Sequence, residues 1–292
     1  MFEGFLDAST RVDGIDVHAV KGGSGPGLLL LHGHPQTHVI WHKVAPTLAA
    51  HFTVIAADLR GYGDSGKPPG ADDHSHYSKR RMARDQIELM CSHGFASFAV
   101  IGHDRGGRVA ARMALDHPDA VTQLVTLDVA PTVAMYEQTS FEFARAYWHW
   151  FFLVRPAPFP ETLIRADPDL YLKQTIGARS AGLAPFTPDA YAAYLRSLSD
   201  PATAHGICED YRASITIDLE HDRADFAAGK RIDCPFLALW GADGVVGKCF
   251  DPLAEWRKWS NDVRGEALAC GHYIPEEAPE LLLERVLSFL QR

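Results

Sequence analysis

Short apolar runs bounded by turn residues recur along this chain, and amphipathic stretches separate them. The runs are about six residues long and uninterrupted, which is typical of strands buried on both faces of a parallel sheet. The stretches between them repeat apolar residues every three or four positions, as helices that cover a sheet do. The predicted strands are residues 27–31, 52–57, 98–101, 124–129 and 236–240. The predicted helices are residues 40–50, 79–92, 107–116, 253–259 and 279–290.

Strands that alternate with helices predict a doubly wound, mostly parallel α/β sheet. The alternation stops between residues 131 and 228, where aromatic residues and prolines crowd into helical patterns without a clear strand. We therefore expect a core made of residues 1–130 and 229–292, with residues 131–228 inserted as a helical cap. Such a lid excludes water from the carboxyl edge of the sheet, where α/β proteins bind their ligands.

The charge balance limits the partners of this chain. Its 292 residues include 28 basic and 37 acidic side chains, a net charge of −9, which argues against nucleic acid or an anionic membrane as a partner. No apolar run approaches the length of about 20 residues that spans a bilayer, and the first residues lack the pattern of a signal peptide. Five cysteines without CxxC spacing favour buried free thiols in a reducing cytoplasm. An anionic substrate would need a local basic site.

The segment around Asp104 predicts the chemistry. It is an apolar strand, a tight turn between Gly102 and Gly106, and the start of a helix, so Asp104 stands at the tip of a nucleophile elbow. A carboxylate is ionised at neutral pH and attacks saturated carbon to form an ester. The elbow therefore predicts substitution at carbon followed by hydrolysis of that ester.

Ester hydrolysis requires a base and an acid that orients it. His272 lies in a loop near the end of the chain, and its imidazole titrates near neutrality, so it is the candidate that activates water. Asp128 and Asp243 both follow predicted strands and precede His272, and either side chain could accept its Nδ1 proton.

Two arginines follow the nucleophile on the predicted helix. Arg105 and Arg108 are three positions apart, so they lie on neighbouring positions of one helix face. A guanidinium pair near a helix N-terminus binds a carboxylate with charge-assisted hydrogen bonds. This pair supplies the local basic site that an anionic substrate needs.

Four motifs occur in the order typical of the α/β-hydrolase fold: His32-Gly33-His34-Pro35, the run from Asp58 to Ser65, Gly102-His103-Asp104-Arg105-Gly106, and Gly271-His272. From about residue 14 to residue 290 the chain resembles the fluoroacetate (haloacetate) dehalogenases. The resemblance implies that Asp104 is the nucleophile, that Arg105 and Arg108 bind the substrate carboxylate, and that Asp128 orients His272.

The resemblance also implies a halide pocket and a homodimer. His149, Trp150 and Tyr211 match the residues that bind the leaving halide in that family. Taken alone, the aromatic run around Trp150 is more typical of core packing. His34 departs from the aromatic residue that often follows His-Gly in these relatives, and it makes the pocket more polar.

The backbone N–H groups of His34 and Arg105 are expected to form an oxyanion hole for ester hydrolysis. We expect no metal and no cofactor. Histidines occur at positions 32, 34, 38 and 42, but their spacing matches no metal-binding motif.

Together these residues predict a hydrolytic dehalogenase that converts fluoroacetate, and other short 2-haloacids, to glycolate and halide. One alternative is an epoxide hydrolase, which uses the same aspartate with tyrosines of the cap; a neutral epoxide would not require two cations. The cap tyrosines that an epoxide hydrolase could use are Tyr136, Tyr147, Tyr171, Tyr191, Tyr194 and Tyr211. Another alternative is a receptor that binds a small acid without turnover.

Overall fold

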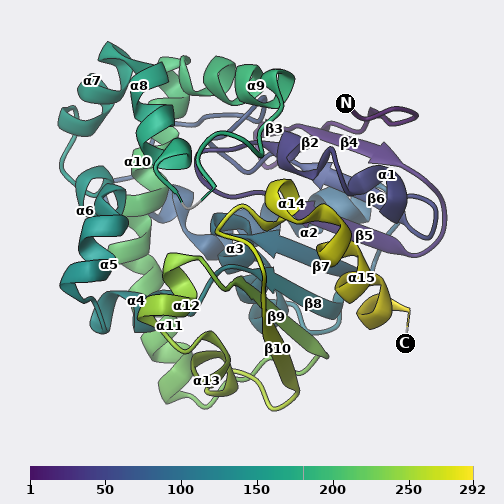
Figure 1. Cartoon of the computed structure of the whole chain (residues 1–292). Coiled ribbons are helices and arrows are strands. Elements are labelled where there is room, and N and C mark those ends of the chain that lie inside the picture. Colours follow the sequence, from purple (N-terminus) through teal and green to yellow (C-terminus); the bar gives the residue numbers. More distant parts are fainter. Residues whose placement is uncertain (180, 292) are drawn as a thin grey trace.

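The computed structural model describes residues 1–179 and 181–291, and its centre is a mostly parallel sheet of eight strands (Figure 1). The strand order is β1-β4-β6-β5-β7-β8-β9-β10. Strands β1 and β4 run antiparallel to their neighbours, and the strands from β6 to β10 are parallel. The sheet consists of β1 (Leu6–Asp7), β4 (Ala19–Gly22), β5 (Gly27–Leu31), β6 (Thr53–Ala57), β7 (Phe98–His103), β8 (Val121–Leu127), β9 (Phe236–Gly241) and β10 (Val263–Leu268).

The five strands predicted from apolar runs all form, with small shifts of their ends. Strand β8 begins three residues earlier than expected and stops at Leu127, so Asp128 begins the following loop. The edge strands β1 and β10, and β4 next to β1, are not among the predicted strands. Strand β10 contains charged residues and is largely exposed, so it lacks the apolar run of a central strand. A separate hairpin pairs β2 (Thr10–Val12) with β3 (Ile15–Val17).

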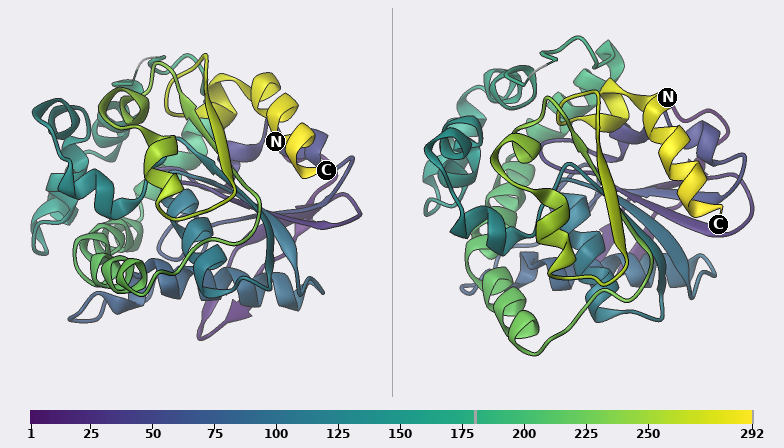
Figure 2. Two further views of the ribbon diagram at one scale, coloured as in Figure 1. Left: turned by 90° about the horizontal axis from the view of Figure 1, so that it is seen from below. Right: turned by 60° about the horizontal axis from the view of Figure 1, so that its bottom comes forward.

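Alternate residues of the central strands enter two different cores. In β5, Leu29 and Leu31 belong to the core under α2 and α3, whereas Leu28 and Leu30 belong to the core under α1 and α15. Successive strand side chains point to opposite faces, so helices on both faces require continuous apolar strands. Figure 2 shows the sheet between these helix layers, which are α1 (Ala45–Leu48), α2 (Lys79–Ser92), α3 (Arg105–Asp116) and α15 (Pro279–Leu290).

The other helices near the sheet are short. The predicted helix at residues 40–50 is instead a 3₁₀ turn, η1 (His38–Trp41), followed by α1, because Pro46 favours the first turn of a new helix. The predicted helix at residues 253–259 ends two residues early. The remaining elements are η2 (Ser75–Tyr77), α12 (Val245–Cys249), α13 (Pro252–Arg257) and α14 (Ile274–Glu277).

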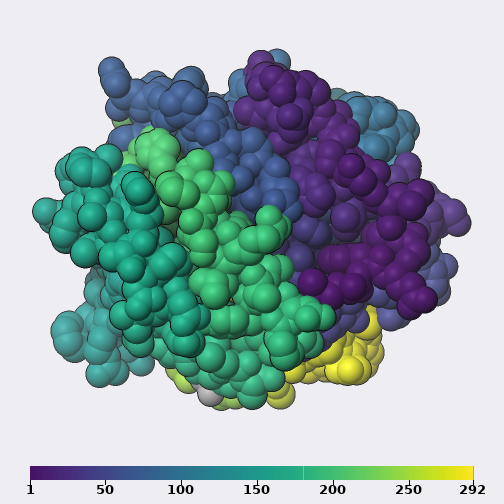
Figure 3. All heavy atoms as spheres, turned by 90° about the horizontal axis from the view of Figure 1, so that it is seen from above, coloured from purple at the N-terminus to yellow at the C-terminus, as the bar shows by residue number. Residues whose placement is uncertain are grey.

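Between β8 and β9 the described residues form helices and no strand. In Figure 1 these helices lie beside the sheet, and in Figure 3 the teal and green segments meet the purple N-terminal segments over one face of the molecule. Within the described ranges, no helix has the length and apolar character needed to cross a membrane. These helices are α4 (Thr132–Glu137), α5 (Phe141–Ala146), α6 (Trp148–Leu153), α7 (Phe159–Ala166), α8 (Pro168–Leu172), η3 (Lys173–Gly177), α9 (Pro188–Leu198), α10 (Pro201–Ile215) and α11 (Ile217–Ala227).

All five cysteines are free thiols, but they are not all buried as expected. Cys208 and Cys270 are buried, whereas Cys91 is exposed. Cys91 lies in the last turn of α2 and is not among the buried residues of that helix.

Candidate active site

Asp104 stands at the turn between β7 and α3. Its φ of 46° lies in the left-handed region, a strained conformation that occurs at functional sites. A Cβ atom on Gly106 would collide with the main-chain carbonyls of Leu31 and His32, so the turn requires glycine there. The turn buries the Asp104 side chain, where its Oδ1 accepts the backbone N–H of His34 at 3.1 Å.

His272 pairs with Asp128 across the carboxyl edge of the sheet. The imidazole Nδ1 lies 2.5 Å from Asp128 Oδ2, and Asp128 Oδ1 accepts the backbone N–H of Gly241 at 2.9 Å. Asp128 also has a left-handed φ, of 48°. A carboxylate that accepts from Nδ1 leaves Nε2 of the neutral imidazole free to take a proton.

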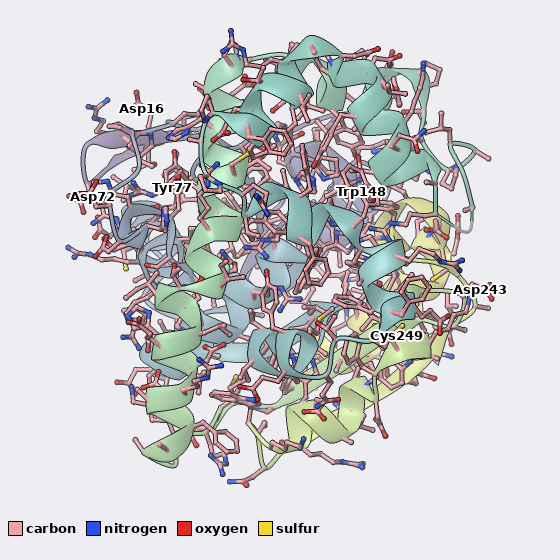
Figure 4. All side chains as sticks on the ribbon, turned by 90° about the vertical axis from the view of Figure 1, so that its left-hand side faces the viewer. Asp16, Asp72, Tyr77, Trp148, Asp243 and Cys249 are labelled. Carbon is pink, nitrogen blue, oxygen red and sulfur yellow. The ribbon has the colours of Figure 1, made fainter. Side chains whose placement is uncertain are left out.

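The second candidate acid lies elsewhere. Asp243 is exposed, and Figure 4 shows it at the periphery of the molecule. Its backbone N–H donates to the carbonyl of Cys270 and its own carbonyl accepts from Lys248, so its main chain shapes a turn. Of the two acids that the sequence left open, the structure brings Asp128 to His272.

Arg105 is buried in an ion cluster that sequence reasoning missed. Its Nε and Nη2 donate to the Asp210 carboxylate at 2.8 and 2.7 Å, and Nη2 also donates to Ser214. Lys79 Nζ donates to Oδ1 of the same carboxylate, the oxygen that also accepts Nη2 of Arg105. Within the described residues Nη1 of Arg105 has no partner, so one edge of the guanidinium is free for an anion.

Arg108 is also buried, but no carboxylate pairs with it in the described parts of the chain. Its Nη1 donates to the carbonyl of Ala130 at 3.0 Å and to Thr132 Oγ1 at 2.8 Å. Its guanidinium carbon lies 4.8 Å from the centre of the Trp150 ring. A buried guanidinium with only neutral partners can compensate a bound anion.

Three side chains from two helices form an aromatic cluster beside the arginines. The His149 and Tyr211 rings are 5.9 Å apart, the Trp150 and Tyr211 rings are 6.2 Å apart, and the Arg105 guanidinium carbon lies 4.2 Å from the Tyr211 ring. His149 Nδ1, Trp150 Nε1 and the Tyr211 hydroxyl are buried, and none has a hydrogen-bond partner among the residues described. Buried donors without partners are costly, so this cluster is suited to a hydrogen-bond acceptor.

His34 joins this cluster to the elbow. Its ring stacks on His149 with centroids 5.5 Å apart, and its Nε2 lies 3.1 Å from the Tyr171 hydroxyl. Burial lowers the pKa of His34 to about 3, so the ring is neutral at physiological pH. The departure from an aromatic residue therefore adds polar groups beside His149 and Tyr171 but no charge.

The local charges keep Asp104 ionised. Burial alone would raise the pKa of this carboxyl, but interactions with His272, and also with Arg105, hold the pKa far below its usual range. Burial lowers the pKa of His149 well below its ordinary value, so this histidine is a neutral donor.

Most of the tyrosines of this helical segment are engaged elsewhere. Tyr191 donates to Asp169 at 2.6 Å and Tyr194 donates to Glu276 at 2.7 Å, while Tyr171 contacts His34. The Tyr147 hydroxyl lies 3.3 Å from His272 Nδ1. Within the described ranges, the hydroxyls of Tyr136 and Tyr211 are buried without a partner.

The histidines of the first motif serve in hydrogen bonds within the fold. His32 Nε2 accepts the Leu59 backbone N–H at 3.0 Å. His18, His38 and Asp58 bring possible metal-ligand atoms within 4.8 Å of one another. However, Asp58 Oδ1 already accepts both the backbone N–H and the Nδ1 of His38, so this group holds two loops together.

Residues that sequence reasoning missed also surround the site. His103 precedes Asp104 in the chain, and its Nε2 lies 2.9 Å from the His272 carbonyl. Asp210 immediately precedes Tyr211, and Lys79 begins α2. Arg179 lies against Tyr147. Position beside a site residue is the one signal that could have found His103 and Asp210; Lys79 and Arg179 carry no such signal.

A family model for the α/β-hydrolase fold matches residues 26–279 of this chain. The chain therefore belongs to the α/β-hydrolase family, as its sheet and the strand–turn–helix unit at Asp104 indicate.

Among characterised relatives, a fluoroacetate dehalogenase from Burkholderia sp. is 47% identical over 99% of this chain and 95% of its own length. A soluble epoxide hydrolase from Corynebacterium sp. strain C12 is 35% identical over 95% of this chain and 94% of its own length. A crystal structure of a protein described as an α/β hydrolase from Nostoc sp. PCC 7120 superimposes with a TM-score of 0.98 and 51% identity, and covers all of both chains.

Proposed function

We propose that this protein is a hydrolytic dehalogenase that converts fluoroacetate, and other short 2-haloacids, to glycolate or the corresponding 2-hydroxyacid and halide. The observation that carries the proposal is the presence of two buried arginines, Arg105 and Arg108, directly after a carboxylate nucleophile. Asp210 already compensates Arg105, but in the described residues no carboxylate forms an ion pair with Arg108. Burying such a guanidinium is costly unless a bound anion compensates it, and a neutral epoxide does not. The similarity to a fluoroacetate dehalogenase supports the same substrate class.

In the first half-reaction, the N–H groups of Arg105 Nη1 and Arg108 Nε, which have no partner in the described residues, bind the substrate carboxylate and hold the α-carbon at Asp104. One carboxylate oxygen of Asp104 forms a bond to that carbon from the side opposite the halogen, and the carbon–halogen bond breaks with inversion. The halide leaves with the bonding electron pair. His149, Trp150 and Tyr211 donate N–H, N–H and O–H to it, and each of these three groups is buried without another partner in the described structure.

In the second half-reaction, His272 takes a proton from water at Nε2 while Asp128 stabilises the resulting imidazolium. The hydroxide attacks the carbonyl carbon of the Asp104 ester. The backbone N–H of His34 already lies on an oxygen of this carboxylate, which supports its role in the oxyanion hole with the N–H of Arg105. The tetrahedral oxyanion then collapses and the bond to the glycolate oxygen breaks, while the His272 imidazolium returns its proton to that oxygen. Glycolate leaves, the oxygen from water remains in Asp104, and the Asp104 carboxyl releases its proton to solvent.

The proposal extends to the domains and the assembly. Residues 131–228 act as a cap that excludes water, and residues 1–130 with 229–292 form the catalytic core. A homodimer is supported by exposed apolar residues on α7 and α8, since Phe159 and Leu163 are one helical turn apart and Leu170 follows on the next helix. Five free thiols support a reducing cytoplasm as the place of action.

Halide release tests the function directly. We expect the purified protein to release fluoride from fluoroacetate and chloride from chloroacetate, measured with ion-selective electrodes, with one glycolate formed per halide. Chloride release without fluoride release would restrict the substrates to the more reactive haloacids. Turnover of styrene oxide without halide release from either acid would instead favour the epoxide hydrolase.

The sequence left open whether Asp128 or Asp243 orients His272. Replacing each aspartate in turn distinguishes the two. We expect Asp128→Asn to lower the steady-state rate by about 10³- to 10⁴-fold, because the amide no longer favours the correct imidazole tautomer. The matched change Asp243→Asn removes an exposed carboxylate and should leave the rate unchanged. Steady-state chloride release by the two variants makes the comparison, and a larger loss in Asp243→Asn would reverse the assignment.

A further inference from the structure

Arg179 brings a third guanidinium close to the site. It follows the π-helix η3 and is partly buried. Its guanidinium carbon lies 4.2 Å from the centre of the Tyr147 ring, and its Nη1 donates to the Ala146 carbonyl at 3.3 Å. Its Nε is buried, and the described residues offer it no hydrogen-bond partner.

Tyr147 connects this arginine to the catalytic groups. The hydroxyl of Tyr147 lies 3.3 Å from His272 Nδ1, and its ring centroid is 5.3 Å from that of His149. Arg179 is therefore separated by one aromatic ring from both the base and the aromatic cluster. The positive charge of Arg179 acts on that cluster: after burial, Arg179 makes the largest contribution to lowering the pKa of His149.

The charges around the site show why a cation here matters. Arg105 is already neutralised by Asp210, whereas no carboxylate pairs with Arg108 or Arg179 in the described residues. The site and its supporting ion cluster hold equal numbers of carboxylates and cations. The carboxylates are Asp104, Asp128, Asp210 and Asp218, and the cations are Lys79, Arg105, Arg108 and Arg179. Without Arg179 the site would be net negative, in a chain whose total charge is −9.

We propose that Arg179 is a specificity-determining residue that attracts anionic 2-haloacids into the site from the side of the helical segment. The inference rests on the proposed function. A carboxylate that approaches the site is attracted by Arg179 and then passes to Arg105 and Arg108 beside Asp104, so Arg179 acts on binding and not on the chemical steps. Salt screens the attraction between the Arg179 charge and the substrate carboxylate. Arg179 should therefore raise kcat/KM most at low ionic strength.

Ionic strength distinguishes this role from simple support of the Tyr147 ring. We expect Arg179→Gln to lower kcat/KM for chloroacetate about tenfold at low salt, mainly through KM, and to flatten the decline of kcat/KM with added salt. Arg179→Lys should restore most of kcat/KM and the salt dependence, because it restores the charge. Binding of acetate, an unreactive carboxylate probe, to Arg179→Gln by calorimetry should weaken by a similar factor.

Arg165 provides the control, because it is an exposed arginine of α7 for which the described structure shows no ion pair. Arg165→Gln removes the same charge and should keep the wild-type KM and salt dependence. The inference is overturned if Arg179→Gln retains the wild-type KM and salt dependence, or if it lowers kcat and shifts the pH profile with an unchanged salt dependence. Absence of halide release by the wild-type protein would instead contradict the proposed function itself.

Discussion

Asp104→Asn is expected to abolish halide release, with a loss of about 10⁵-fold or more. The amide is neutral and a much weaker nucleophile than the ionised carboxylate, and no other carboxylate occupies the tip of the elbow. The buried position and its hydrogen bond from His34 allow an isosteric replacement to fold normally. Chloride release from chloroacetate, followed over many turnovers, measures the loss, and circular dichroism verifies the fold.

Two controls make this result specific to the nucleophile. Asp243→Asn makes the same chemical change at an exposed aspartate and should retain full activity. A single turnover of the wild-type protein in heavy-oxygen water should place the label in Asp104, detected by mass spectrometry of the peptide that contains it. Label found in glycolate alone would contradict a covalent intermediate, and would indicate direct attack of water on the substrate.

His272→Asn is expected to stop the cycle after the first half-reaction. Asp104 can still displace the halide, but no base activates water, so the ester accumulates. Rapid-quench measurements should show one halide released per active site, followed by a steady-state rate about 10⁴-fold lower than that of the wild-type protein. The intact mass of the variant should increase by one carboxymethyl group. A variant that turns over normally would show that another residue is the base.

This variant also isolates the ionisation of Asp104. The substitution removes His272, the largest of the charge interactions that lower the Asp104 pKa, but Arg105 and Arg108 remain beside this carboxyl and also lower its pKa, so it stays ionised in mild acid. The size of the halide burst and its rate in His272→Asn should therefore remain constant from neutral pH down to about pH 4, where a free aspartate would be half protonated. A burst rate that falls between these limits would show that Arg105 and Arg108 do not keep the Asp104 pKa low once His272 is removed.

Local sequence patterns were sufficient for much of the fold. The central strands and the helices α2 and α15 form where continuous apolar runs and amphipathic repeats predict them, because burial on both sheet faces leaves a direct mark on the sequence. The edge strand β10 was not predicted, because an exposed strand carries charged residues and no apolar run. The glycines likewise identified the elbow, because Gly106 lies only two positions after Asp104 in the chain. The structure shows the positive φ of Asp104 and the close approach at Gly106 that this turn requires.

The supporting contacts of the site depend on tertiary structure. The pair formed by His272 and Asp128 joins positions 144 residues apart, and the bond from Arg105 to Asp210 joins positions 105 residues apart. No local pattern encodes such a pairing, because any strand end with an acid satisfies the same spacing, as Asp243 did. The sequence by itself determined the strand–turn–helix units and the residue types that carry the chemistry. Only the tertiary structure decided which charges meet, because burial makes each charge depend on partners that the folded chain brings from distant elements.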